Sequence, residues 1–326
     1  MAMATLPLVR RGLRASRLAL GCMGLGGGWN DAAIDESHVR EAEAALDAAL
    51  EVGINFFDHA DIYTRGKAET VFGRVLKGRP GLREHVFLQT KCGIRFGEGP
   101  RVPARYDFSA CHILASVEGS LARLGVEYLD VLLLHRPDPL VEGEEVAEAF
   151  HRLNADGKVR HFGVSNMSEG QIRYLQAWLD VPVIVNQLEM GLTRIGFLET
   201  GVHVNQSAAQ ANTFPDGTLE YCRLENIQLQ AWSPLAKGYL SGRSLDDAPE
   251  SVRATAALVA EMAAERGVSR EAVVIAWLLA HPAGIQPVIG TKTPERIRAC
   301  AEALGLNLSR EDWYALYVTA RGRPLP

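Results

Sequence analysis

The sequence has few cysteines, no long apolar run and no cluster of like charge. Its 326 residues include five cysteines, an odd number, which are widely spaced and form no CxxC pair. This usage is typical of reduced thiols in a cytoplasm and predicts neither disulfides nor a structural zinc site. No stretch approaches the ~18 consecutive apolar residues of a membrane span. We therefore expect a cytoplasmic protein.

Charge excludes two further classes of partner. The formal net charge is −5, and lysine and arginine are scattered along the chain. Nothing in this distribution predicts binding to nucleic acid or to an anionic membrane. The expected partners are small molecules, and the expected assembly is a monomer or a small homo-oligomer.

Arg10 and Arg11 precede an apolar segment at 18–22, as in a secretion signal, but Arg14, Ser16 and Arg17 interrupt the apolar run that such a signal requires.

What the sequence does contain is a regular alternation of short apolar runs and segments of helical period. Runs rich in Val, Ile, Leu and Phe occur at 17–23, 55–57, 86–90, 131–134, 161–164, 184–188, 227–232 and 287–289. Such runs are typical of parallel strands buried on both faces. Eight strands with intervening helices predict an α/β fold, a closed (β/α)8 TIM barrel. We expect one domain over 1–326, with an N-terminal hairpin at 6–13 and an extra C-terminal helix at 309–320.

The competing fold is an open, doubly wound sheet. Its glycine fingerprint would follow the first strand, where residues 24–28 offer a glycine-rich loop. The GxGxxG spacing is not met there, and the acidic residue expected about 20 residues later is missing from a strand end.

Three connections that follow predicted strands are long, at 93–108, 189–215 and 234–250. In a barrel they would lie on the catalytic face and shape a pocket there.

Polar side chains end three of the predicted strands. Asp58 and Tyr63 follow the second strand, Lys91 closes the third and His135 closes the fourth. A nearby ammonium group stabilises a phenolate, so we expect Lys91 to lower the pKa of Tyr63. Asp58 would hold Lys91, and His135 would donate a hydrogen bond to a carbonyl oxygen. Such a site protonates an oxygen while a hydride reaches the carbon.

With these motifs in order, the chain resembles the aldo-keto reductase superfamily over nearly its whole length. The matching segments are Asp58 to Tyr63, Thr90-Lys91, Leu134-His135, Gly163-Val164-Ser165-Asn166, Asn186-Gln187, Trp232-Ser233-Pro234-Leu235 and Ile289-Gly290-Thr291. The resemblance implies an NADP(H)-dependent reductase of aldehydes or ketones. It implies that Tyr63 is the general acid, that Lys91 and Asp58 tune it, and that His135 orients the substrate.

The same resemblance implies a set of cofactor contacts and no metal ligand. Ser165, Asn166 and Gln187 would hold the nicotinamide amide, and Trp232 would stack on the ring. Lys292 and Arg296 would pair with a 2′-phosphate, which favours NADPH over NADH. The complete expected set is Met23, Asp58, Ser165, Asn166, Gln187, Trp232, Ser233, Pro234, Leu235, Lys237, Gly238, Ile289, Gly290, Thr291, Lys292 and Arg296.

Two alternative functions remain at this point, and a third is disfavoured. A catalytically weak, cofactor-binding regulatory protein, similar to channel beta subunits, would share the fold and these residues. A short-chain dehydrogenase is suggested by the Tyr63-x-x-x-Lys67 spacing, although no nucleotide fingerprint precedes it. A metal-dependent barrel hydrolase would need clustered His and carboxylate ligands, which the strand ends lack. The sequence does not identify the substrate.

Overall fold

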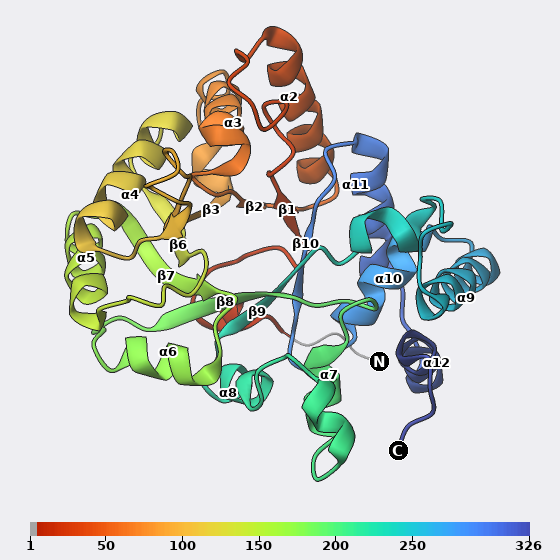
Figure 1. Ribbon diagram of the computed structural model, residues 1–326. Helices are drawn as coiled ribbons and strands as arrows, with labels where there is room; N and C mark the ends of the chain where they lie inside the picture. Colours follow the sequence, from red (N-terminus) through yellow and green to blue (C-terminus); the bar gives the residue numbers. More distant parts are fainter. Residues whose placement is uncertain (1–4) are drawn as a thin grey trace.

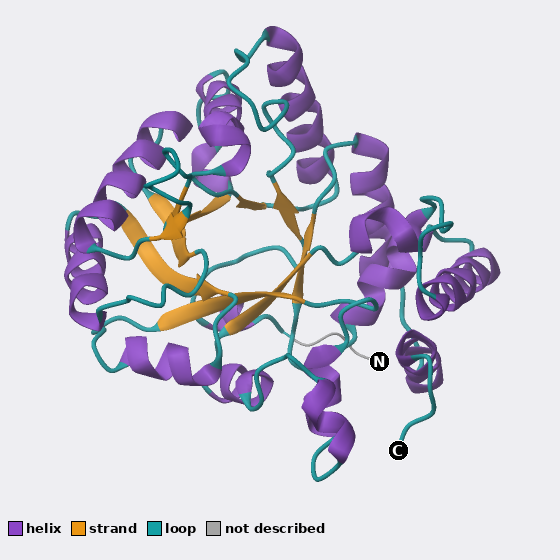
Figure 2. Cartoon of the chain, in the orientation of Figure 1, coloured by secondary structure: helices purple, strands orange, loops and turns teal. Residues whose placement is uncertain are grey.

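The strands of the protein close into a parallel barrel that is surrounded by helices (Figures 1 and 2). The computed structural model describes residues 5–326. The barrel strands are β1 (Ala19–Gly21), β2 (Phe56–Asp58), β3 (Phe87–Cys92), β6 (Leu129–Leu134), β7 (Val159–Ser165), β8 (Val183–Glu189), β9 (Gln228–Trp232) and β10 (Gln286–Ile289). They follow one another in this order around the barrel, and β10 pairs with β1. The predicted (β/α)8 barrel is confirmed, and the open-sheet alternative is wrong.

Helices form the outer layer (Figure 2). The helices next to the barrel are α2 (Glu36–Glu51), α3 (Lys67–Lys77), α4 (Ala110–Leu124), α5 (Gly143–Ala155), α6 (Glu169–Gln176), α8 (Thr218–Leu224), α10 (Arg270–Leu279) and α11 (Pro294–Ala301). Their amphipathic faces explain their position. In α2, for example, the Asp35 side chain caps the first turn, and Ala42, Ala45 and Leu46 lie on the buried face.

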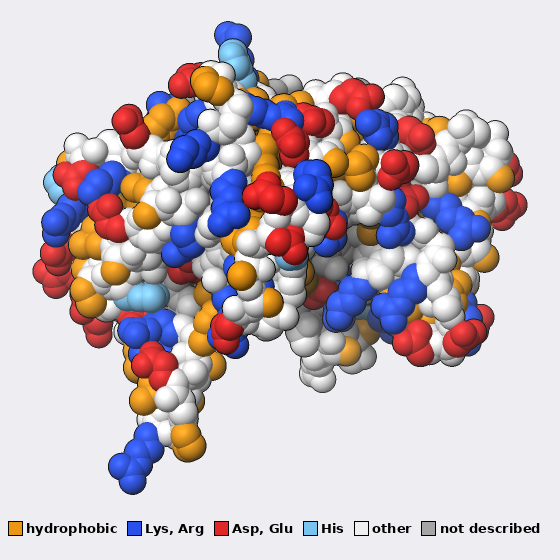
Figure 3. Space-filling model, turned by 90° about the horizontal axis from the view of Figure 1, so that it is seen from above, with side chains coloured by type: hydrophobic (Ala, Val, Ile, Leu, Met, Phe, Trp, Pro, Cys, Tyr) orange, Lys and Arg blue, Asp and Glu red, His pale blue; other side chains and the backbone are white. Residues whose placement is uncertain are grey.

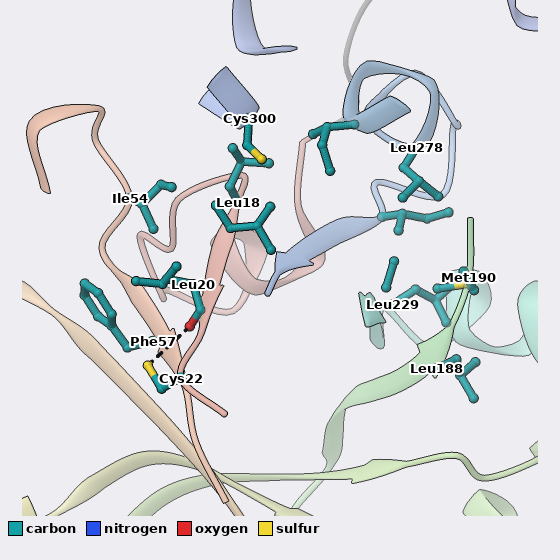
Figure 4. Close-up of a cluster of buried hydrophobic side chains, with 14 of the residues drawn as sticks. Leu18, Leu20, Cys22, Ile54, Phe57, Leu188, Met190, Leu229, Leu278 and Cys300 are labelled. Atoms are coloured by element: carbon teal, nitrogen blue, oxygen red, sulfur yellow. Dashed lines mark hydrogen bonds between the residues drawn. The ribbon is translucent and has the colours of Figure 1, made fainter. Parts of the chain in front are cut away.

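The apolar core has two parts because strand residues alternate between two sides. Side chains on the outer side pack against the helices. Figure 4 shows this layer, with Leu20, Phe57 and Leu229 from the strands and Leu278 from α10. Side chains on the inner side fill the barrel, where Phe56, Val131 and Val288 belong to a separate cluster.

The N-terminal hairpin prediction is wrong. Residues 7–10 form a short helix, α1 (Pro7–Arg10), with the proline in its first turn. Proline has no N–H to donate, which disfavours a paired strand and suits a helix start. The Leu8 and Leu13 side chains join the cluster inside the barrel, so the N-terminal segment contributes to the filling of the barrel interior.

The extra C-terminal helix is confirmed as α12 (Arg310–Arg321). As its sequence predicts, Ser309 caps the helix and exchanges hydrogen bonds with Asp312. Trp313 of α12 stacks on Trp277 of α10 at 5.3 Å between ring centroids. Each indole N–H donates to the other tryptophan's backbone carbonyl oxygen, at 3.1 and 3.0 Å. This reciprocal contact attaches α12 to the barrel's helical layer.

The three long connections contain structure of their own. The first carries a two-stranded hairpin of β4 (Ile94–Arg95) and β5 (Arg105–Tyr106), and the second carries α7 (Gly196–Val202) and the 3₁₀ helix η3 (Ser207–Ala211). The third contains η4 (Ala236–Ser241) and leads into α9 (Glu250–Arg266), against which α12 packs. The remaining 3₁₀ helices are η1 (Tyr63–Gly66), η2 (Arg83–His85) and η5 (Glu302–Gly305).

The surface agrees with the scattered charge of the sequence. Figure 3 shows Lys and Arg interspersed with Asp and Glu, and neither sign gathers into one continuous patch on this face. Among residues 5–326, no helix is both long and apolar enough to cross a membrane.

Candidate active site

A buried lysine is the centre of the site. Lys91, on β3, is fully buried, and its ammonium group donates three hydrogen bonds. The acceptors are the Asp58 carboxylate at 2.7 Å, the Tyr63 hydroxyl at 3.0 Å and the His59 backbone oxygen at 2.8 Å. An ammonium group has three protons, so all of them are used. The structure therefore brings the predicted Asp58, Tyr63 and Lys91 together as one hydrogen-bonded group.

A tight turn places Tyr63 over the barrel. Tyr63 begins η1, in which Thr64, Arg65 and Gly66 all have positive φ angles, at 47°, 62° and 81°. The Thr64 hydroxyl donates to the Leu25 carbonyl oxygen of the loop after β1 at 2.9 Å. Two non-glycine residues in this conformation represent stored strain, which is characteristic of functional sites.

The protonation states differ from the expectation in one respect. Burial raises the pKa of the Tyr63 phenol, and the charge of Lys91 offsets only part of that increase. The predicted lowering of the phenol's pKa is therefore wrong. Burial also opposes the charge on Lys91, but Asp58 and Tyr63 outweigh it, and the pKa of Lys91 is raised. At neutral pH the site consequently holds a neutral phenol beside a charged ammonium group.

His135 completes the predicted group of four. Its ring lies edge-on to the Tyr63 ring, with 5.9 Å between centroids. Burial, reinforced by the charges of Lys91 and Arg136, holds the pKa of His135 well below its usual range. The imidazole is therefore neutral at physiological pH, and a neutral imidazole retains one N–H to donate. Its Nδ1 atom is buried without a hydrogen-bond partner among residues 5–326.

A row of glutamines inside the barrel supports Asp58, and the sequence interpretation missed it. Gln89 and Gln187 donate to the Asp58 carboxylate at 2.6 and 3.1 Å, and both also donate to Gln230. Gln230 in turn donates to Gln286 at 2.9 Å. The sequence does contain a signal for Gln89, because residues two apart on a strand point to the same side. Gln89 precedes the inward-facing Lys91 by two residues and is therefore expected to face the barrel interior as well.

Two acidic residues, the partly buried Asp61 and the buried Glu69, lie near the Tyr63 turn. Asp61 carries one carboxylate oxygen without a hydrogen-bond partner among the described residues. Burial, with the nearby Glu69 carboxylate, raises the pKa of Asp61 to about 7. Glu69 is fully buried and accepts from the Thr90 hydroxyl at 2.6 Å and from Arg123 at 2.8 Å.

The residues expected around a nicotinamide ring contact one another. Asn166 follows β7 with a positive φ of 59° and donates to the Ser165 hydroxyl at 2.8 Å. Its amide oxygen accepts from the Trp232 indole at 3.2 Å, and its amide nitrogen lies 3.4 Å from the His135 carbonyl oxygen. Gln187 is one strand away, but its amide nitrogen is used by Asp58 and Gln230. Through these hydrogen bonds Asn166 connects His135 with the half-buried Trp232.

The segment expected along a pyrophosphate has a suitable backbone. Ser233, Ala236, Lys237 and Gly238 have positive φ angles of 56°, 50°, 55° and 93°. Successive residues in such turn conformations direct their N–H groups into a concave surface that binds anions. Of the other expected members, Pro234 is buried, Leu235 is partly buried and the Lys237 side chain is exposed. This conformation therefore fits an anionic group.

The residues expected at the adenosine end lie after β10 and at the start of α11. Lys292 forms an ion pair with Glu41 of α2 at 2.8 Å. Arg296 lies 3.4 Å from Glu271 and donates to the Ser241 hydroxyl of η4 at 3.2 Å. Both cations therefore have carboxylate partners. The remaining members are Ile289, which is buried, Gly290, which faces open space, Thr291, which accepts from the Thr293 backbone, and Met23, which is 53 % exposed.

A cavity of about 780 Å³ opens beside this cluster. Its lining includes Arg136, Asn166 and Trp232, residues of the connection after β8, and Arg323 of the C-terminal segment. That connection is attached to the C-terminal segment by Glu199 of α7, which accepts from Arg321 at 2.7 Å, from Tyr317 and from His203. We call these four residues the clasp. Glu199 and His203 are both largely buried and also belong to the lining of the cavity.

Two alternative functions find little support in these positions. Lys67 donates to Asn30 at 3.0 Å and to the Ala32 carbonyl oxygen at 3.3 Å, so it serves the loop after β1 and does not reach Tyr63. Across residues 5–326, no cluster of three or more His, Cys, Asp or Glu side chains could hold a metal ion.

A parallel barrel with a buried carboxylate–lysine pair and a partly buried tyrosine at its carboxyl end is suited to acid–base chemistry on a bound small molecule. Comparison with known proteins agrees. The model of the Aldo/keto reductase family matches residues 17–317. The chain belongs to the aldo-keto reductase family.

Individual relatives support this assignment over most of their length. An uncharacterized oxidoreductase of Bacillus subtilis is 39% identical over 299 residues, which cover 90% of this chain and 93% of that protein. A 6-dehydroglucose reductase of Agrobacterium fabrum is 38% identical, with coverage of 95% and 96%. The solved glycerol dehydrogenase of Gluconobacter oxydans has a TM-score of 0.78 and 26% identity, with coverage of 100% and 98%.

Proposed function

We propose that the protein is an NADP(H)-dependent reductase that converts aldehydes or ketones to alcohols. The observation that carries the proposal is the contact of the Lys91 ammonium group with both Asp58 and Tyr63, at 2.7 and 3.0 Å. Family membership and the anion-binding backbone at 236–238 support the choice of cofactor. We also infer that the chain forms one barrel domain.

In the proposed reaction, the neutral Tyr63 phenol gives its proton to the carbonyl oxygen. Lys91 stabilises the phenolate that remains, because its positive charge lies 3.0 Å from the oxygen. Asp58 keeps the ammonium group charged and fixed in place, and the glutamines fix Asp58. The neutral His135 donates a hydrogen bond that orients the carbonyl group. When bound, NADPH supplies the hydride that the carbonyl carbon accepts, and solvent returns a proton to Tyr63 after the alcohol leaves.

The test is oxidation of NADPH with a panel of aldehydes, ketones and oxidised sugars. Oxidised sugars belong in it because the relative in Agrobacterium fabrum is named a 6-dehydroglucose reductase. We expect Tyr63→Phe to retain NADPH binding, measured by tryptophan fluorescence, and to lower kcat by about 10²–10⁴. Tyr314→Phe, which removes a phenol of α12, is the matched control. Unaltered turnover by Tyr63→Phe would contradict the assigned proton donor.

A second candidate is a cofactor-binding regulatory protein. A relative in Schizosaccharomyces pombe, 29% identical over 316 residues, has a name that provisionally assigns it to the voltage-gated potassium channel beta subunits. The two candidates differ in turnover. Repeated cycles of NADPH oxidation favour the reductase, whereas tight NADPH binding with no more than one oxidation per protein across the whole panel favours the regulatory protein.

A further inference from the structure

Each carboxylate that lines the cavity is paired with at least one arginine. Glu189 pairs with Arg194 at 3.1 Å. At the far end, Glu199 pairs with Arg321 at 2.7 Å and lies 3.6 Å from Arg323. The carboxylates on the wall therefore already have partners. Arg194 and Arg323 of the lining lie within 4 Å of a carboxylate, whereas Arg136 forms no salt bridge among the described residues.

Arg136 is half-buried but forms no ion pair or hydrogen bond within the described part of the chain. The nearest acidic residue in sequence, Asp138, is used elsewhere, because it accepts from the Phe108 and Leu140 backbone N–H groups at 3.0 and 2.9 Å. The contact that Arg136 does make is with the Trp232 ring, 5.7 Å from its centroid. That distance is near the limit for a cation–π interaction, which is worth only about 0.5–1 kcal/mol at an exposed site.

The position of Arg136 relates it to the reacting group. It directly follows His135, whose ring faces Tyr63. It also lies over Trp232, whose indole is hydrogen-bonded to Asn166. Arg136 thus connects the chain position next to His135 with the cavity, so a substrate whose carbonyl group contacts His135 would place its remaining part near this guanidinium group. Guanidinium groups bind carboxylates and phosphates through paired N–H donors.

We propose that Arg136 is a specificity-determining residue that binds an anionic group, a carboxylate or a phosphate, on the carbonyl substrate. This inference rests on the proposed reductase function and names its substrate class. The substrate is a carbonyl compound that carries an oxyanion a short distance from the reacting carbon. The other arginines of the lining, Arg194 and Arg323, are already paired with carboxylates. Arg136 is therefore the residue that selects an anionic substrate.

The experiment compares substrate pairs that differ in one charge. The carboxylate pair is 4-carboxybenzaldehyde and its methyl ester, and the phosphate pair is glyceraldehyde 3-phosphate and glyceraldehyde. We expect a higher kcat/KM for the charged member of at least one pair, and the pair that responds identifies the oxyanion. Arg136→Met is expected to lower the charged-to-neutral ratio of kcat/KM by about 10- to 100-fold, as for loss of a charge-assisted hydrogen bond. Arg136→Lys keeps the charge but loses the paired donors, so its charged-to-neutral ratio of kcat/KM is expected to lie between those of the wild type and Arg136→Met.

Arg152→Met is the matched control, because it removes an exposed arginine of α5 and the same unit of net charge. It is expected to leave the ratio within about threefold, since exposed charges at a distance are screened by salt. An equal loss for charged and neutral substrates in Arg136→Met would overturn the inference. Wild-type indifference to charge in both pairs would overturn it as well.

A binding measurement separates this inference from the reductase proposal. Benzoate and inorganic phosphate are titrated into the protein with NADP⁺ present, and binding is followed by calorimetry. Anion binding that Arg136→Met abolishes supports the anion site even if no carbonyl compound is reduced, an outcome that would overturn only the reductase proposal. Reduction of neutral carbonyls without anion binding would overturn the anion site alone.

Discussion

The barrel interior and the cavity wall hold their polar groups in different ways. Inside the barrel, Asp58, Lys91 and the glutamines come from strands on opposite sides, β2 and β3 on one side and β8 to β10 on the other, and form one continuous hydrogen-bonded chain. The cavity wall is a long connection, and Glu199 ties it to a helix more than a hundred residues further along the chain. The first arrangement is set by strand register, and the second by the clasp together with the packing of Phe197 against Trp277.

We infer from this difference that the barrel interior carries the reaction and that the cavity wall determines which substrate binds. A rigid scaffold suits groups that must stay within a fraction of an ångström of a productive geometry. A connection attached at few points can vary in sequence while the barrel is preserved. We therefore expect changes in the interior to affect kcat and stability, and changes in the wall to affect KM.

The largest effect is expected for Lys91→Met. The substitution leaves the buried Asp58 carboxylate without its cation, and breaking a buried pair in this way costs about 3–5 kcal/mol. The hydrogen bonds from Gln89 and Gln187 to Asp58 remain, so folding should persist at reduced stability. We expect kcat to fall by about 10²–10⁴. Denaturant unfolding and steady-state kinetics measure the two effects.

Lys158→Met provides the comparison for that variant. Lys158 also forms an ion pair, with Glu118, but both side chains are substantially exposed. Exposed pairs contribute about 0–1 kcal/mol, so this variant should keep near-normal stability and activity. A similar loss of stability in both lysine variants would mean that the buried Lys91–Asp58 pair contributes no more to stability than the exposed Lys158–Glu118 pair.

An intermediate effect, dependent on pH, is expected for Asp61→Asn. The pKa of Asp61 is raised from 3.8 to about 7 in the folded protein. Between these values the unfolded chain releases the proton while the folded protein retains it, so wild-type stability falls as pH rises through this window. The asparagine variant lacks this penalty. Its stability advantage should therefore grow from about pH 4 to pH 7 and stay constant above, as measured by urea unfolding across pH. An advantage independent of pH would contradict the raised pKa.

The two regions also differ in how far the sequence predicts them. Asp58, Lys91 and His135 end predicted strands, and parallel strands place their carboxyl ends at one edge, so their proximity could be predicted. Gln89 could have been added from the strand period of two. The clasp could not, because the contact of Glu199 with Arg321 joins a loop to a terminal helix and has no periodic signal. The pKa of Tyr63 was predicted in the wrong direction because its burial depends on packing that the sequence does not reveal.

The smallest effect is expected for Arg321→Met in the clasp. The Arg321 side chain is 1% exposed and donates to Glu199, while none of its hydrogen bonds reaches the Lys91 group. Its loss should loosen α7 and thereby the cavity wall, so we expect KM to rise about three- to tenfold with kcat within about twofold. Hydrogen exchange should accelerate at 196–211 and stay unchanged in β3. Arg310→Met, an exposed change on the same helix, is the control. A fall in kcat with an unchanged KM would mean that wall and interior are coupled, because selection and proton transfer would then depend on the same contacts.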